Sequence, residues 1–154
     1  MSANWGHHIE LSLFGESHGK AIGITIGHLP AGIKLDMDAI TKDMQRRAPG
    51  KNLMSTQRKE ADEVEILSGV LDGYTTGAPL CGIIKNTSQH SKDYSYLKDN
   101  MRPGHSDYPA YIKYKGFNDV RGGGHFSGRL TAPIVFAGAI AKQILKEKGI
   151  HVGA

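Results

Sequence analysis

Cysteine and long apolar runs are the scarcest features of this 154-residue sequence. The single cysteine, Cys81, excludes an intramolecular disulfide framework, and its apolar neighbours predict a buried structural thiol in a reducing compartment. No apolar stretch approaches the roughly 20 residues that a membrane-spanning helix needs. The N-terminal residues are polar and rich in histidine where a signal peptide has an apolar core. We therefore expect a cytoplasmic protein with no membrane partner.

A dense basic stripe is also absent. The formal net charge is only +4, and arginines are isolated, mostly beside glycine, proline or serine. They are Arg46, Arg47, Arg58, Arg102, Arg121 and Arg129. Nucleic-acid-binding proteins usually cluster their basic residues and interleave aromatic ones, whereas arginines in separate loops suit bidentate capture of carboxylate or phosphate groups. We expect a small polyanionic ligand and no nucleic acid.

Glycine, in contrast, is abundant. The 20 glycines concentrate in residues 15–27, 69–82 and 116–128, between apolar stretches. Glycine in such places indicates sharp turns or a backbone that approaches a ligand closely. With 39% hydrophobic and 22% charged residues, the chain has the composition of one globular domain.

The hydrophobic pattern predicts an α+β fold. Alternation predicts strands at 8–14, 21–27, 63–71 and 79–85. A helix is expected from a cap at Asp36 or Asp38 to Arg47, and a second one after Ser127, ending at Gly149. Residues 86–119 lack an apolar period and are expected to form a long functional loop. Residues 150–152 resemble the start of another strand, so we expect the chain to be the N-terminal part of a longer domain.

Two histidines are framed by residues that could give them chemical roles. Gly-Glu-Ser-His-Gly at 15–19 places His18 beside Ser17 in a loop with free amides, where His18 could act as an acid. In residues 102–107, a Pro-Gly turn presents His105, and Asp107 could orient its ring. The alternatives are surface histidines in ordinary turns. A metal site built from His105 and Asp107 has no further ligand to support it.

The strongest local signal is residues 121–131, Arg-Gly-Gly-Gly-His-Phe-Ser-Gly-Arg-Leu-Thr. A glycine-rich loop that runs into the N-terminus of a helix is suited to binding phosphate. Glycine triplets also serve as plain connectors, but the flanking Arg121 and Arg129 favour an anion site. From the residues alone, a non-catalytic anion- or RNA-binding module and a phosphohydrolase with His18 as nucleophile stay open.

Taken together, three motifs resemble the chorismate synthase family. They are Gly-Glu-Ser-His-Gly at 15–19, Arg-Pro-Gly-His at 102–105 and Gly-Gly-Gly-His-Phe-Ser-Gly-Arg-Leu-Thr at 122–131, and their order and spacing also match. Segments 46–50, 56–60 and 67–70 are similar to intervening parts of the same family. The resemblance therefore covers nearly the whole chain.

This resemblance implies a β-α-β sandwich fold with antiparallel sheets around core helices, incomplete in this chain. It implies a lyase that converts 5-enolpyruvylshikimate 3-phosphate to chorismate and phosphate by anti-1,4-elimination. The reaction requires reduced FMN without net redox change, and NADPH as well if the enzyme reduces its own flavin. A homotetramer is expected for the full-length protein, and no metal is expected.

The resemblance also assigns residues. His18 matches a catalytic histidine at the departing phosphate, and His105 matches one at the reduced flavin. Expected substrate-binding residues are Ser17, Arg46, Arg47, Arg58, Arg102 and Arg129. Expected cofactor-binding residues are Arg47, His125, Phe126 and Ser127, although many family members carry Arg-Ser in place of His125 and Phe126. Further flavin contacts and a catalytic aspartate are expected outside this sequence.

Overall fold

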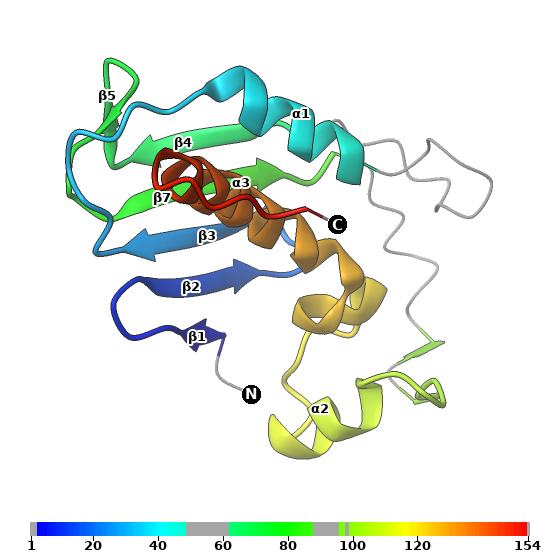
Figure 1. The fold of residues 1–154 in the computed structure, drawn as a ribbon. Coiled ribbons are helices and arrows are strands. Elements are labelled where there is room, and N and C mark those ends of the chain that lie inside the picture. The colour runs from blue at the N-terminus through cyan, green and yellow to red at the C-terminus, as the bar shows by residue number, and fades with distance from the viewer. Residues whose placement is uncertain (1–2, 49–61, 88–95, 98, 154) are drawn as a thin grey trace.

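A computed structural model of the chain describes residues 3–48, 62–87, 96–97 and 99–153 (Figure 1). Its main sheet is antiparallel, with the strand order β1-β2-β3-β7-β4. These strands are β1 (Asn4–Trp5), β2 (Glu10–Gly15), β3 (Ala21–Gly27), β4 (Val64–Ser68) and β7 (Leu80–Lys85). A separate hairpin pairs β5 (Val70–Leu71) with β6 (Tyr74–Thr75).

The strand predictions are confirmed with one change. The segment predicted as a single strand at 63–71 is divided into β4 and β5 by Gly69, which has a φ of 85°. A Cβ at Gly69 would lie 2.4 Å from the Leu80 Cα, so only glycine allows this close approach of two strands. Cys81 is half-buried rather than buried, because its side of β7 is the face without helices.

Helices α1 (Met37–Arg47) and α3 (Thr131–Glu147) pack against each other on one face of the sheet (Figure 1). The Asp36 side chain caps α1 by accepting a hydrogen bond from the Ala39 amide at 3.0 Å. Alternate residues of β3 and β7 face these helices and form the core with Phe136 and Ile140 of α3. A Cβ at Gly82 would lie 2.4 Å from the Phe136 ring, so glycine makes room for that ring.

Helix α3 buries only part of its apolar side chains. Phe136 and Ile140 are buried at its centre, whereas Ile134 is 41% exposed on the outer side of the helix. The prediction of a strand at 150–152 is wrong, because these residues pair with no strand in the described part of the chain. Helix α3 ends at Glu147 with Lys148 as its C-cap, Gly149 follows with a φ of 74°, and the Ile150 amide donates to the Leu145 carbonyl.

The predicted long loop at 86–119 contains a helix that the pattern did not reveal. Helix α2 (Asp107–Lys113) is short, and Asp107 and Ala110 are its buried residues, so it has no apolar period to detect. It is followed by two tight 3₁₀ segments, η2 (Arg121–Phe126) and η3 (Gly128–Leu130), which lead into α3. This connection carries much of the candidate site. The α+β class is confirmed.

Candidate active site

The glycine loop of η2 lies between the two histidines. Gly122, Gly123 and Gly124 all have positive φ, at 59°, 87° and 56°, which side chains other than glycine adopt only with strain. A Cβ at Gly122 would lie 2.2 Å from the His18 ring, and one at Gly123 would lie 2.9 Å from the His105 ring. The loop therefore brings together two histidines that are 87 positions apart in the sequence (105 − 18).

His18 is held in a buried loop. Ser17 is fully buried, and its Oγ lies 3.2 Å from His18 Nδ1 and 3.2 Å from the Gly122 carbonyl oxygen. The Ser17 amide donates to the Gly124 carbonyl at 3.1 Å. His125 Nδ1 lies 2.8 Å from the Gly15 carbonyl oxygen, and because a carbonyl can only accept, this Nδ1 carries a proton. The loop after β2 is thus fixed against η2 at several points.

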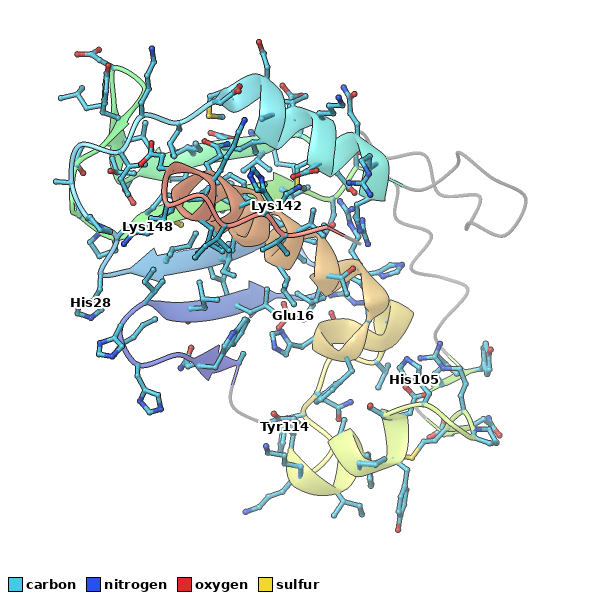
Figure 2. The ribbon with its side chains drawn as sticks, in the orientation of Figure 1. Glu16, His28, His105, Tyr114, Lys142 and Lys148 are labelled. Carbon is cyan, nitrogen blue, oxygen red and sulfur yellow. The ribbon has the colours of Figure 1, made fainter. Side chains whose placement is uncertain are left out.

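His105 lies in the turn before α2 (Figure 2), and ion pairs hold it there. Arg102 donates from Nε and Nη2 to both oxygens of Asp107, at 2.8 and 2.9 Å. His105 Nδ1 lies 2.6 Å from Asp107 Oδ1, which makes an ion pair when the imidazole is protonated, and 3.2 Å from Arg102 Nη2, so both residues of the pair orient the ring. The hydrogen bonds from Arg102 hold the pKa of Asp107 far below its usual value of 3.8. Asp107 is therefore ionised at neutral pH.

A third cluster joins the end of α1 to the start of α3. Asp62 accepts from Arg47 Nη1 at 2.6 Å and, with its other oxygen, from Arg129 Nη1. Arg47 Nη2 also donates to the Gly128 carbonyl and to Thr131 Oγ1, both at 3.2 Å. Sequence reasoning missed Asp62, because one carboxylate at the edge of a polar segment gives no signal.

Asn86 connects this third cluster to the His18 loop. Its Nδ2 donates to the carbonyls of Glu16 and Gly19, at 3.0 and 2.9 Å, and its Oδ1 accepts from Arg129 Nε at 3.4 Å. Asn86 directly follows β7, and that position after a strand was the only available hint of its role. The three clusters thus form one continuous site around η2.

The comparisons with known proteins agree with this arrangement. The family model for chorismate synthase matches residues 9–154. The chain belongs to the chorismate synthase family. Among the curated relatives named chorismate synthase, the one from Flavobacterium psychrophilum is 54% identical over 152 residues, which cover 98% of this chain and 42% of the relative. The one from Thermococcus kodakarensis is 50% identical over 149 residues, covering 97% and 42%.

A solved chorismate synthase structure has the same fold. It matches with a TM-score of 0.65 and 29% identity, and the match covers 96% of this chain but 36% of that structure. The chain spans about two fifths of the length of the curated relatives that it matches.

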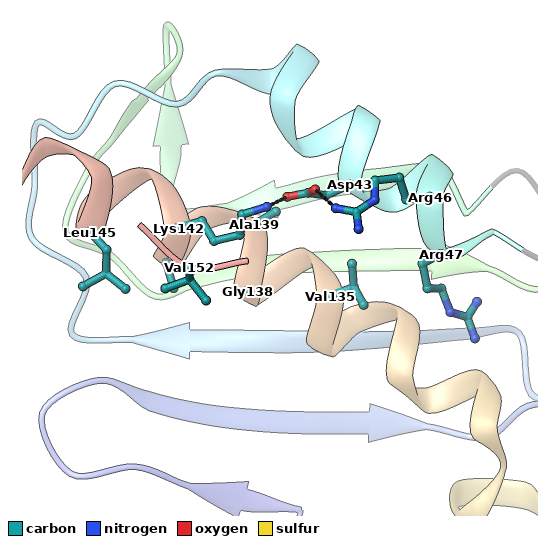
Figure 3. Close-up of a pocket in the computed structure, with 10 residues that line it drawn as sticks. Asp43, Arg46, Arg47, Val135, Gly138, Ala139, Lys142, Leu145 and Val152 are labelled. Carbon is teal, nitrogen blue, oxygen red and sulfur yellow. Dashed lines mark hydrogen bonds and ion pairs between the residues drawn. The ribbon is translucent and has the colours of Figure 1, made fainter. Parts of the chain in front are cut away.

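The other residues expected in a chorismate synthase site are distributed unevenly. Ser127 uses its Oγ to cap η3 by accepting from the Arg129 amide at 3.3 Å. Phe126 packs 6.2 Å from Tyr114, measured between ring centroids. Arg46 is adjacent to Arg47 on α1 but diverges from it and lies 3.6 Å from Asp43, in a groove of about 510 Å³ between α1 and α3 (Figure 3). Arg58 lies outside the described residues.

The described residues of the structure contain neither a clustered metal site nor a membrane-spanning helix. Among the residues that it describes, no three histidine, cysteine, aspartate or glutamate side chains gather to hold a metal ion. None of the helices in the described ranges combines the length and apolar character needed to cross a membrane.

Proposed function

We propose that this chain forms the N-terminal part of a single chorismate synthase domain. The complete protein then acts as a lyase that converts 5-enolpyruvylshikimate 3-phosphate to chorismate and phosphate by anti-1,4-elimination. The observation that carries this proposal is the contact of His18 and His105 with consecutive glycines, Gly122 and Gly123. It places one imidazole on each side of a loop that η3 connects to the arginines.

His18 is suited to act on the departing phosphate. Ser17 Oγ has a single hydrogen, and if it donates to the Gly122 carbonyl, its lone pair can accept from His18 Nδ1. A protonated His18 then keeps both ring hydrogens, with the one on Nε2 directed away from Ser17. A cationic imidazole neutralises the negative charge that develops on phosphate oxygen as the C–O bond breaks.

Arg47 and Arg129 supply permanent positive charge for the anionic substrate. Each guanidinium group pairs with one oxygen of Asp62. Asn86 links Arg129 to the loop that bears His18 by hydrogen bonds to both. Prearranged donors lose little conformational freedom when an anion binds, which strengthens binding. Arg102 contributes chiefly by holding Asp107 and, through it, His105.

His105 is the residue of this chain best suited to contact reduced FMN. Its side chain is 29% exposed, Asp107 holds it at Nδ1, and its Nε2 lies 3.4 Å from Arg102 Nη2, so a ligand at this ring would meet an imidazole already oriented by two charged groups. The ring nitrogens of His105 can donate to or accept from the polar atoms of a flavin, so this residue fits the cofactor. Arg47, His125, Phe126 and Ser127 complete the proposed contacts. When bound, reduced FMN supplies transient electron density that eases phosphate departure. The chain's own part would be to present His105, oriented by Asp107, to the flavin.

The test uses a protein of the length of the curated relatives that contains these residues, called the full-length protein below. It is incubated anaerobically with reduced FMN and 5-enolpyruvylshikimate 3-phosphate while chorismate absorbance is followed. We expect chorismate to form in equal amount to the phosphate released. No absorbance change at saturating flavin would overturn the proposal.

The same experiment separates the rival functions. A phosphohydrolase would release phosphate and form no new diene, and an anion- or RNA-binding module would form neither product but bind RNA with strong salt dependence. A cytoplasmic location, a homotetramer and, if the enzyme reduces its own flavin, a requirement for NADPH belong to the same proposal. The last is tested by replacing reduced FMN with oxidised FMN and NADPH.

A further inference from the structure

Asp62 is the most enclosed ionised group of the site. Its side chain is 0% exposed, and it contacts two arginines whose side chains are 4% (Arg129) and 21% (Arg47) exposed. A buried carboxylate must be paired to remain stable, and here each oxygen has its own guanidinium. Asp62 therefore joins two residues that are 82 positions apart in the sequence (129 − 47).

The charges in this cluster do not cancel. Two arginines surround one carboxylate, so the three groups together carry one net positive charge. Arg121, in contrast, pairs with one carboxylate, Asp119, within the described part of the chain. The Asp62 cluster is thus neutralised enough to be buried and still attracts an anion.

The backbone at Asp62 also serves this placement. Its φ is 50°, in the left-handed region that aspartate and asparagine tolerate better than most residues. This turn directs the carboxylate inward immediately before β4 begins at Val64. The guanidinium of Arg47 is additionally held by Gly128 and Thr131, so its orientation is defined by three acceptors.

We propose that Asp62 is a positioning residue that holds Arg47 and Arg129 as a pair in the orientation that captures the substrate's anionic group. The inference rests on the proposed function for the identity of the substrate. It goes beyond the expected site residues because both oxygens of Asp62 are engaged by the arginines, so Asp62 acts on an anion through them. Its effect is transmitted through the geometry of the two arginines.

A role of Asp62 in local charge and a role in positioning the arginines predict opposite effects of Asp62→Asn on anion binding. Removal of the carboxylate raises the local charge from +1 to +2, so a role in charge alone predicts tighter anion binding. Loss of the fixed geometry predicts weaker binding, on the order of 10- to 100-fold, since small displacements of binding groups have effects of this size. Asparagine keeps the shape and tolerates the left-handed backbone.

The experiment is calorimetric titration of the full-length protein with two probes, 5-enolpyruvylshikimate 3-phosphate and inorganic phosphate, with oxidised FMN present. Asp72→Asn is the matched control, because Asp72 has the same φ of 50° but lies exposed in the β5–β6 turn. We expect Asp62→Asn to weaken binding of both probes and Asp72→Asn to change neither. Unchanged or tighter binding in Asp62→Asn would overturn the inference.

Asp62→Glu keeps the inference testable if Asp62→Asn does not fold. Glutamate preserves the charge and the ion pairs but moves the carboxylate by one methylene, so positioning predicts weaker binding by a folded protein. Wild-type affinity in Asp62→Glu would contradict it. The two proposals fail separately: phosphate binding that depends on Asp62, in a protein that forms no chorismate, would remove the proposed function and keep the positioning role.

Discussion

At the scale of single residues, the two histidines are held in different ways. His18 is 7% exposed and lies between Ser17 and Gly122, whereas the side chain of His105 is 29% exposed and is fixed by Asp107. A buried imidazole beside a hydroxyl suits proton transfer to a sequestered phosphate. A partly exposed one suits contact with a second, larger ligand.

His18→Ala and His105→Ala are each expected to lower kcat of the full-length protein by on the order of 10²- to 10⁴-fold, the usual contribution of a positioned acid or base. Substrate affinity should change little, because the arginines supply most of the attraction. The measurement is chorismate formation at saturating flavin, together with substrate titration. His8→Ala, at an exposed position, is the control. Wild-type turnover in either variant would remove the role of that histidine.

Asp107 makes stability depend on pH. Its pKa in the folded protein lies below the ordinary 3.8, mainly because of the hydrogen bonds from Arg102, so the ionised form stabilises the fold. This contribution is fully present above about pH 4 and is lost as the pH falls toward the lower folded value.

Asp107→Asn should therefore lower the free energy of unfolding by about 1–2 kcal/mol at pH 7. The difference in unfolding free energy between the variant and the wild type should be smaller at pH 3. Urea unfolding at the two pH values measures this. Asp99→Asn, at an exposed position, provides the comparison. A difference that stays constant between pH 7 and pH 3 would show that Asp107 does not act through its ionised form.

At the scale of elements, η2 is the segment on which the site depends. It has three consecutive glycines with positive φ. The Gly124 carbonyl accepts a hydrogen bond from the Ser17 amide, and the segment contacts both histidines. Its conformation is determined less by local preference than by the loops on each side. A change in this backbone should therefore affect both histidines together.

Gly122→Ala is expected to lower activity by more than tenfold and stability by about 1–3 kcal/mol, because it combines a left-handed backbone with a clash against His18. Gly128→Ala is the matched control, since a Cβ there meets nothing within 4 Å and its φ is not in the strained range. Comparable effects of the two substitutions, in unfolding and in turnover, would argue against the role of Gly122.

At the scale of the whole molecule, the helical layer has a second, outer side. Ile134, Gly138 and Ala141 are exposed there along α3, and the groove between α1 and α3 lies beside them (Figure 3). The curated relatives are more than twice as long as this chain. These features agree with the proposal that further residues complete the domain and its pocket.

The 154-residue chain alone is accordingly expected to bind FMN weakly and to produce no chorismate, while the full-length protein does both. The comparison uses flavin fluorescence for binding and chorismate absorbance for turnover, with both proteins at the same concentration. Turnover by the shorter chain would show that these residues already contain a sufficient active site.

The sequence predicted most of the local structure correctly, because its signals are local. Alternation located β3, the Asp36 cap located α1, and Gly149 located the end of α3. It did not predict α2, because that helix buries too few residues to show a period. The strand expected at 150–152 did not form, because a strand requires a partner that no local pattern specifies.

For the site, the sequence alone predicted which loops carry chemistry and, through its motifs, indicated the chorismate synthase family. The roles of His18, His105 and the arginines remain predictions that the variants above can test. Only the tertiary structure revealed Asp62 and Asn86 and showed that Gly122 adjoins His18 while Gly123 adjoins His105. The reason is physical: a buried ion pair or a backbone contact joins residues distant in the chain, and its geometry exists only after folding.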